Sequence, residues 1–233
     1  MLFIITTPTK KCNLLGENIL TFLEIFFSSS QIMNFVLKYV QKSGGFMLKT
    51  CDIIDEKNKI LRQVSEEVTI PLTKEDKKNI KLMEEYLVNS QIEELAEKYD
   101  LRPGMGMSAV QIGVLKRYIV IVMEVTTEDD DEQVFDTYVV INPKIVSNSE
   151  EKIYVEDGEG CLSINRETTG IVPRFARCTV EGYDMDGKKI RIRAREELSI
   201  AFQHEIDHLN GILFIDHIDP KDPFKGKDIY RPI

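Results

Sequence analysis

The run Gln203-His204-Glu205-Ile206-Asp207-His208-Leu209 contains the pattern His-Glu-x-x-His, and this pattern guides the interpretation of the whole chain. The chain has only three histidines among 233 residues, and two of them lie in this run. On a helix, His204 and His208 lie on one face, so both imidazoles can bind one metal ion. Glu205 would lie beside that metal, where a carboxylate can accept and return a proton. The run predicts a metal site rather than an amphipathic helix with two surface histidines.

A catalytic site of this kind uses three protein ligands, so one more ligand is needed. The 25 residues after His208 contain no glutamate, which excludes the ligand set of thermolysin-like proteases. In the metzincin pattern, a third histidine would stand at Phe214. The best upstream candidate is Cys161, in Glu159-Gly160-Cys161-Leu162-Ser163, because a thiolate binds such metals well. Taken alone, a cysteine is more often a small buried residue.

Three motifs in one order resemble those of the peptide deformylase family. They are Gly104-Met105-Gly106-Met107-Ser108-Ala109-Val110-Gln111, then Glu159 to Ser163, then Gln203 to Gly211. The resemblance extends from about Met47 to about His217. The start at Met47-Leu48 and the insertion-like stretch from Gln91 to Arg102 resemble the longer, Gram-positive-type (type 2) branch. Ser108 and Val110 replace the more usual alanine and proline, and neither change removes a polar group that the chemistry needs.

The resemblance implies a metal-dependent hydrolase that removes the N-formyl group from the N-terminal methionine of newly made polypeptides and releases formate. It assigns the metal ligands to Cys161, His204 and His208. This ligand set suits Zn²⁺, Ni²⁺ or iron, and the resemblance implies one Fe²⁺ ion per chain in the cell.

The resemblance also implies the catalytic groups. Glu205 would move the proton, while the Gln111 side-chain amide and the Leu162 backbone N–H would stabilise the oxyanion. Substrate contacts are expected from the glycine loop and the helix: Gly104, Met105, Gly106, Ile200 and Ala201. Ile200 and Ala201 precede His204 by four and three residues, hence on its side of a helix, and Met105 could complete an apolar methionine pocket. The two glycines let the backbone approach an extended peptide.

Two other functions remain open from the residues. A metallopeptidase would use the same helix and glutamate to cut internal peptide bonds. A non-catalytic metal module would have four protein ligands, with Cys178 completing a Cys₂His₂ set.

Composition limits the partners. A net charge of −9 and a pI near 5.0 argue against a specific nucleic-acid binder, and a ribosome-associated enzyme would need a local basic patch instead. The four cysteines show no paired spacing, which fits a reducing, cytoplasmic compartment. We expect a monomer that acts on N-formyl-methionyl nascent peptides, with transient ribosome contact and no membrane association. The acidic run at 128–132 is expected to be a solvated loop.

Residues 1–46 differ from the rest. Their apolar stretch, Ile19 to Val40, is interrupted by Glu24 and three serines, so it is a poor membrane span, and it lacks the features of a signal or transit peptide. Ser43-Gly44-Gly45-Phe46-Met47 could be encoded by a bacterial ribosome-binding site before a start codon. We therefore favour an over-extended translation start for residues 1–46 over an anchor, and expect one catalytic domain at 47–233.

The remaining patterns predict an α+β fold in which antiparallel β-sheets pack around a central metal-binding helix. Thr73 and Asp76 form a capping-box pattern that predicts the start of a helix. Strands are expected at 118–125, at 137–141 with Asn142-Pro143 as its end, and at 152–155. Asp186-Gly187 predicts a hairpin between strands at 178–185 and 189–194. The metal-binding helix is expected from about Glu196 to Asn210, with Gly211 as its stop.

Overall fold

The structure, a computed structural model, describes residues 47–125 and 133–233. Contacts divide the chain into Met1–Phe46 and Met47–Ile233, and the second unit is described by itself. The predictions for residues 1–46 and for the acidic run at 128–132 lie outside the described residues.

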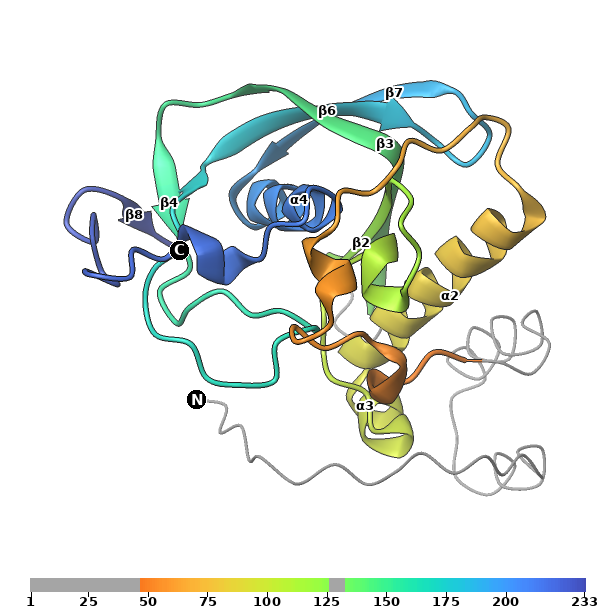
Figure 1. Ribbon diagram of the computed structural model, residues 1–233, viewed down its shortest axis with the longest axis horizontal. Coiled ribbons are helices and arrows are strands. Elements are labelled where there is room, and N and C mark those ends of the chain that lie inside the picture. Colours follow the sequence, from red (N-terminus) through yellow and green to blue (C-terminus); the bar gives the residue numbers. More distant parts are fainter. Residues whose placement is uncertain (1–46, 126–132) are drawn as a thin grey trace. The chain divides into compact units, whose positions relative to one another are not determined.

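Helices and strands alternate irregularly along the second unit (Figure 1). The α-helices are α2 (Lys74–Gln91), α3 (Glu93–Tyr99) and α4 (Glu196–Leu209), and short 3₁₀ helices include η4 (Ala109–Ile112) and η5 (Phe214–His217). The strands are β1 (Gly106–Ser108), β2 (Tyr118–Val125), β3 (Val134–Asn148), β4 (Lys152–Tyr154), β5 (Arg174–Phe175), β6 (Arg177–Tyr183), β7 (Lys189–Arg195) and β8 (Arg231–Pro232).

These strands form two sheets. A five-stranded sheet has the order β1-β2-β3-β6-β7, and all its neighbours are antiparallel. A three-stranded sheet has the order β5-β4-β8, in which only the β4–β8 pair is parallel. The fold is therefore α+β with largely antiparallel sheets, as the sequence predicts.

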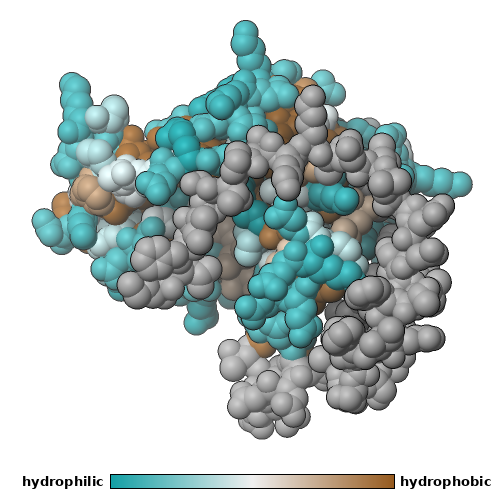
Figure 2. Space-filling view, turned by 90° about the horizontal axis from the view of Figure 1, so that it is seen from below, coloured by the Kyte–Doolittle hydropathy of each residue, from teal (hydrophilic) through white to brown (hydrophobic). Residues whose placement is uncertain are grey.

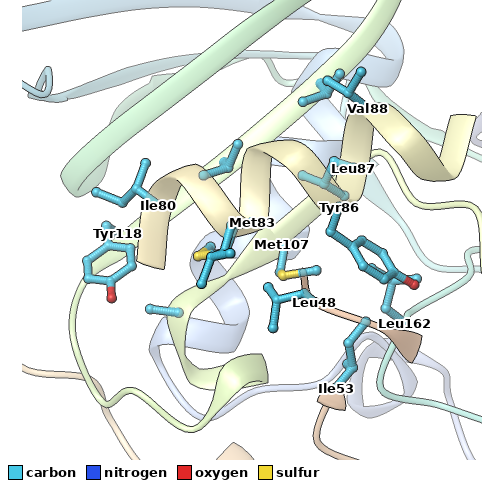
Figure 3. Packing of buried hydrophobic residues seen from close by; sticks show 14 of the residues in the cluster. Leu48, Ile53, Ile80, Met83, Tyr86, Leu87, Val88, Met107, Tyr118 and Leu162 are labelled. Carbon is cyan, nitrogen blue, oxygen red and sulfur yellow. The ribbon is translucent and has the colours of Figure 1, made fainter. Parts of the chain in front are cut away.

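The larger sheet is covered on both faces at its β1–β2 end. One face of β2 packs with α2, where Val120 and Val122 join Ile80, Met83 and other buried residues (Figure 3). The opposite face packs with α4, where Ile119 and Ile121 join a second apolar cluster. Because both faces are buried, β2 is a continuous apolar run instead of an alternating one.

Strands β6 and β7 are covered mainly on one face. Their burial alternates residue by residue, and Val180, Ile190, Ile192 and Ala194 belong to the cluster beside α4. This alternation is the pattern of an antiparallel sheet with one solvated face. On the face away from α4, the β7 residues are exposed, whereas Thr179, Glu181 and Tyr183 of β6 are half-buried and Tyr183 packs against the cluster that contains α2.

The predicted helix boundaries are confirmed. Thr73 and Asp76 form the capping box of α2, with the Thr73 side chain accepting from the Asp76 N–H at 3.1 Å. Helix α4 begins at Glu196 and ends at Leu209, and Gly211 follows with φ +75°. The left-handed conformation at Gly211 is the one that glycine adopts without strain after a helix.

Several strand boundaries predicted from the sequence are wrong. The strand expected at 137–141 is part of β3, which already begins at Val134. Asn142-Pro143 does not end a strand, because β3 continues to Asn148 through a β-bulge at this point. Asn142 has φ +51°, and its side-chain amide bonds both the N–H and the carbonyl of Val68 at 2.8 and 2.9 Å. A residue at a β-bulge does not have to donate a backbone hydrogen bond to the neighbouring strand, so proline, which has no N–H, is tolerated there. The hairpin is confirmed, but β6 ends at Tyr183 because Asp184 already belongs to the turn, where its N–H donates to the Lys188 carbonyl.

The surface of the described residues is mostly hydrophilic, as Figure 2 shows for one face. The exposed large hydrophobic residues in residues 47–125 and 133–233 are few and scattered: Val64, Val134, Val146, Phe224 and Ile229. No helix within these ranges is both long and apolar enough to cross a membrane.

Candidate metal centre and active site

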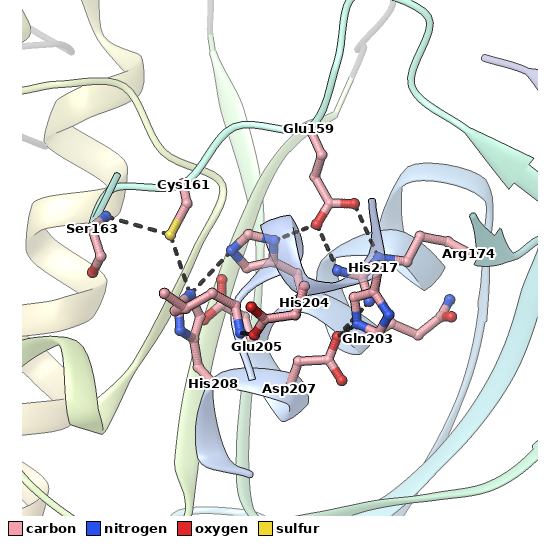
Figure 4. A network of polar contacts seen from close by, with 12 residues as sticks. Glu159, Cys161, Ser163, Arg174, Gln203, His204, Glu205, Asp207, His208 and His217 are labelled. Carbon is pink, nitrogen blue, oxygen red and sulfur yellow. Dashed lines mark hydrogen bonds and ion pairs between the residues drawn. The ribbon is translucent and has the colours of Figure 1, made fainter. Parts of the chain in front are cut away.

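Three candidate ligands converge at one point beside α4 (Figure 4). Their ligand atoms all lie within 4.8 Å of one another. His208 Nε2 is 3.2 Å from His204 Nε2 and 3.2 Å from the Cys161 Sγ. The histidines are brought together by one helical turn, whereas Cys161 comes from the long segment between β4 and β5. The spacing of His204 and His208 on one helix face agrees with the sequence prediction.

The orientation of His204 is fixed by Glu159. The Nδ1 of His204 lies 2.6 Å from Glu159 Oε1. Because an ionised carboxylate only accepts, Nδ1 carries the proton and Nε2 keeps its lone pair toward Cys161 and His208. Glu159 thus selects the ring tautomer that can bind a metal through Nε2.

Glu159 is itself held by a buried arginine. Arg174, which is 3 % exposed, donates to both carboxylate oxygens of Glu159 at 3.0 and 2.7 Å. It also donates to Asp207 Oδ2 at 2.5 Å, and Asp207 in turn pairs with His217 at 2.7 Å. Burial alone would raise the pKa of Glu159, but Arg174 and His204 lower it to about 2. Glu159 therefore stays ionised behind the histidine.

Glu205 is buried beside the ligands and held by strand β1. Its Oε2 is 2.5 Å from the Ser108 hydroxyl, which also lies 2.9 Å from the Glu205 carbonyl oxygen. A Cβ added at Gly106 would lie 2.5 Å from Glu205 Oε1, so only glycine leaves room for this carboxylate. Burial raises the pKa of Glu205, which favours a group that can hold a proton and release it.

Gln111 lies in η4, at the end of the glycine loop. Its Oε1 accepts from the Ser108 N–H at 2.8 Å. Its Nε2 donates to the Ser163 hydroxyl at 3.1 Å and lies 3.7 Å from the Cys161 Sγ. The side-chain amide is thus fixed with its donor end toward Cys161.

Leu162 lies between the glycine loop and a clamping arginine. A Cβ at Gly104 would lie 2.8 Å from the Leu162 Cδ1, so the loop touches this side chain closely. Arg102 donates to the carbonyls of Leu162, of Cys161 at 2.9 Å and of Ile164 at 3.2 Å. The backbone around Cys161 and Leu162 is therefore held by Arg102, two residues before Gly104.

The expected pocket residues do not all come together. Met105 and Ala201 belong to one apolar cluster, beside Phe202. Ile200 packs instead with Ile153 and Ala176. All three lie close to α4 or on it, and Ile200 and Ala201 are 6 % and 8 % exposed.

Cys178 does not belong to the group of ligand atoms. It is buried in the apolar cluster between α4 and the sheet, and burial raises the pKa of its thiol. Within the described residues, the candidate metal-binding group consists of Cys161, His204 and His208. Three protein ligands leave a coordination position open, which is typical of catalytic sites rather than structural ones.

Several residues of the site were missed by the sequence analysis. Glu159 stands inside a recognised motif, but its bond to His204 depends on the folded loop. The local sequence of Arg174, Asp207 and His217 gives no signal for their network. The Ser108 hydroxyl was noted only as a departure from the family motif, although it contacts the Glu205 carboxylate.

The site fits a divalent metal ion. Two imidazole nitrogens and a sulfur face one another, with the Nδ1 proton of His204 turned away toward Glu159. Such a set of electron-pair donors suits a cation of the zinc or iron type. With a buried glutamate beside it, this arrangement is that of a metal-dependent hydrolase.

Comparison with known proteins identifies the hydrolase. Residues 50–224 match the polypeptide deformylase family. A peptide deformylase 2 of Bacillus anthracis is 46% identical over 187 residues, covering 80% of this chain and 99% of the relative. A peptide deformylase of Halalkalibacterium halodurans is 48% identical over 180 residues, covering 77% and 96%. The crystal structure of the Ehrlichia chaffeensis enzyme has a TM-score of 0.56 and 32% identity, covering 76% of this chain and 90% of that one.

The chain belongs to the peptide deformylase family of metal-dependent hydrolases and removes the N-formyl group from the N-terminal methionine of newly made polypeptides. This assignment decides against the metallopeptidase that the residues alone left open.

Proposed function

We propose that Cys161, His204 and His208 bind the catalytic metal and that Glu205 is the proton-transfer group of the deformylation reaction. The observation that carries this proposal is the approach of three ligand atoms, within 4.8 Å of one another, beside a buried carboxylate. In this view α4 is the central element of the fold, since it supplies both histidines and the glutamate and contacts strands of both sheets.

Each residue has a defined part in formamide hydrolysis. A divalent ion held by the three ligands would supply Lewis acidity and lower the pKa of water toward neutrality. Glu205 accepts the proton of the attacking water as that water adds to the formyl carbon. It then delivers the proton to the amine nitrogen as the C–N bond breaks. The bond from Ser108 holds Oε2, and Oε1 faces the gap that Gly106 leaves open.

The developing oxyanion is assigned to two donors, the Gln111 Nε2 amide and the Leu162 backbone N–H. The Gln111 side chain accepts from the Ser108 N–H and donates to the Ser163 hydroxyl, and these two bonds support the role because they fix the amide before substrate arrives. A donor of this kind typically contributes roughly 3 kcal/mol to the barrier reduction.

The formyl-methionine end of the substrate is assigned to the glycine loop and the adjoining residues of α4. Gly104 and Gly106 would let extended substrate backbone approach, and Met105, Ile200 and Ala201 would contact the methionine side chain. Packing of Met105 with Ala201 in one apolar cluster supports this assignment for these two residues.

We further propose Fe²⁺ as the native ion, as the family resemblance implies; the thiolate and imidazole ligands suit iron, zinc and nickel alike. The proposed enzyme works as a cytoplasmic monomer on nascent chains and touches the ribosome transiently. Its catalytic domain is residues 47–233. The match at 50–224, and a relative covered over 99% of its own length by 187 residues, support that boundary. The over-extended start at residues 1–46 stays a prediction.

The ligand assignment is tested with two cysteine variants. Cys161→Ala should lose bound metal and formate release from N-formyl-Met-Ala, whereas Cys178→Ala, the matched control, should keep both. Metal content is measured anaerobically by elemental analysis, which also identifies the ion. Full metal occupancy in Cys161→Ala would contradict the assignment.

The role of Glu205 is tested in metal-loaded protein. Glu205→Gln keeps the size of the side chain but removes the proton acceptor. Its kcat should fall about 10²- to 10⁴-fold, the range typical of general acid–base catalysis, while metal content stays unchanged. Turnover near the wild-type rate would exclude Glu205 as the proton-transfer group.

A further inference from the structure

The face of strands β6 and β7 away from α4 is strongly basic. Alternate residues of β7 point away from α4, and they are Lys189, Arg191, Arg193 and Arg195. Residues two apart on a strand lie about 6.7 Å from each other, so these four cations extend over roughly 20 Å. β7 is an edge strand of the five-stranded sheet, and the four residues are exposed.

The neighbouring strands β6 and β3 add further basic residues next to this row. Arg177 of β6 pairs in register with Arg195, and Lys144 of β3 pairs with Glu181. The outward residues of β6 and β7 include one acid, Glu181, which already contacts Lys189 at 3.3 Å and Arg191 at 2.9 Å. We define the basic face as Lys144, Arg177, Lys189, Arg191, Arg193 and Arg195.

Three members of the basic face carry charge without an ion-pair partner. Lys144, Arg193 and Arg195 form no ion pair with any residue in 47–125 or 133–233, and all three are exposed. By contrast, Arg177 shares Glu151 with Arg231. This concentration of positive charge occurs in a chain whose net charge is −9, so it is a local feature and not a reflection of composition.

Protection of the sheet edge does not account for the pattern. Charged side chains on an edge strand prevent pairing with other molecules, and either sign of charge serves that purpose. Here every outward residue of β7 is positive, and three of the four are arginines. The planar guanidinium group binds phosphate oxygens in a bidentate manner, which lysine cannot do.

We propose that the basic face binds the phosphate backbone of RNA without sequence preference. RNA fits better than a membrane, because membrane-binding surfaces add exposed apolar groups to basic ones. No outward residue of β6 or β7 is a large aliphatic side chain. The basic face deepens the proposed ribosome contact, since RNA is the polyanion of ribosomes. Its position opposite α4 leaves the metal site free.

The test uses the full chain and a fluorescently labelled single-stranded RNA. Arg193→Gln/Arg195→Gln removes the two cations of β7 that form no ion pair within the described residues. The matched control, Lys77→Gln/Lys78→Gln, removes the same charge from exposed positions of α2. Binding is measured by fluorescence anisotropy over a series of salt concentrations. Thermal unfolding and deformylation of N-formyl-Met-Ala should be unchanged in both variants, so failure of the catalytic proposal is seen separately.

The expected result is a change in salt dependence. Each phosphate contact contributes about 0.7 to the slope of log K against log salt for single strands, so the arginine variant should lose roughly 1.4. Its affinity at low salt should fall about tenfold or more. The lysine variant should keep the wild-type slope. The proposal is overturned if both variants bind alike, if the wild-type chain does not bind RNA at low salt, or if only anionic phosphatidylglycerol vesicles bind.

Discussion

Replacement of Arg174 by methionine tests whether the buried charges behind His204 support the fold as a unit. The guanidinium makes three hydrogen bonds to carboxylates, two to Glu159 and one to Asp207, in a site where the arginine is 3 % exposed. Methionine fills a similar volume but leaves the Glu159 carboxylate buried without its principal cation. The perturbation is thus electrostatic rather than a cavity.

The expected loss follows from this burial. Removing one partner of a buried ion pair typically costs about 3–5 kcal/mol, because the other charge is left uncompensated. For a domain of 150–250 residues, each kcal/mol shifts Tm by about 2–4 °C, so Tm should fall by roughly 6–20 °C. Glu159→Gln should also destabilise the domain. The loss of stability in the double variant should be about 2–3 kcal/mol smaller than the sum of the two single losses, because no ionised Glu159 is then left buried without Arg174.

The assay is thermal and urea unfolding of metal-free protein in chelator, so that altered metal affinity does not contribute. The exposed pair Lys225–Asp219, at 2.8 Å, provides the control. Lys225→Met should leave the unfolding midpoints nearly unchanged, because an exposed ion pair contributes little to stability. A loss below about 1 kcal/mol for Arg174→Met, or strictly additive losses in the double variant, would refute the reasoning.

Three further predictions follow from other contacts. Ser108→Ala should lower kcat about fivefold with KM and metal content unchanged, because one hydrogen bond of roughly 1 kcal/mol to Glu205 is lost; an unchanged kcat in steady-state kinetics would count against it. Burial would raise the pKa of Asp76, but bonds from Lys116 and Thr73 lower it below its usual value. Its contribution to stability is therefore present above about pH 4 and lost as the pH falls further. In urea unfolding at a series of pH values, the free energy of unfolding of Asp76→Asn should fall less steeply below about pH 4 than that of the wild type. An equal dependence on pH in the two proteins would exclude this contribution. A chain beginning at Met47 should fold, bind metal and deformylate at close to the full-chain rate, and an inactive shortened chain would contradict the boundary.

The sequence alone determined the features that depend on residues close together in the chain. Residues four apart on a helix lie on one face whatever the rest of the chain does, so His204 and His208 were correctly placed together. The capping box at Thr73 and the glycine stop at Gly211 are equally local, and both helix ends were predicted correctly. Family resemblance added Cys161, which spacing alone could not select.

Contacts between distant segments were decided only by the tertiary structure. Arg174 reaches Glu159 and Asp207 because β5 and α4 pack together, and no periodicity records that packing. The continuation of β3 through Asn142-Pro143 depends on Val68, 74 residues away, whose backbone groups bond the Asn142 side chain. Loop closure over such distances is set by the global fold, so local patterns contain little information about it.

The basic face depends both on the local sequence pattern and on the tertiary structure. Alternation along 189–195 is visible in the sequence, and a strand with this period must place its cations on one side. Whether that side would be covered by a helix or open to solvent was decided by the packing of α2, which covers β2 and leaves the outward residues of β7 exposed. Burial of α4 against the other face, through Ile190, Ile192 and Ala194, is the physical reason that the cations face outward.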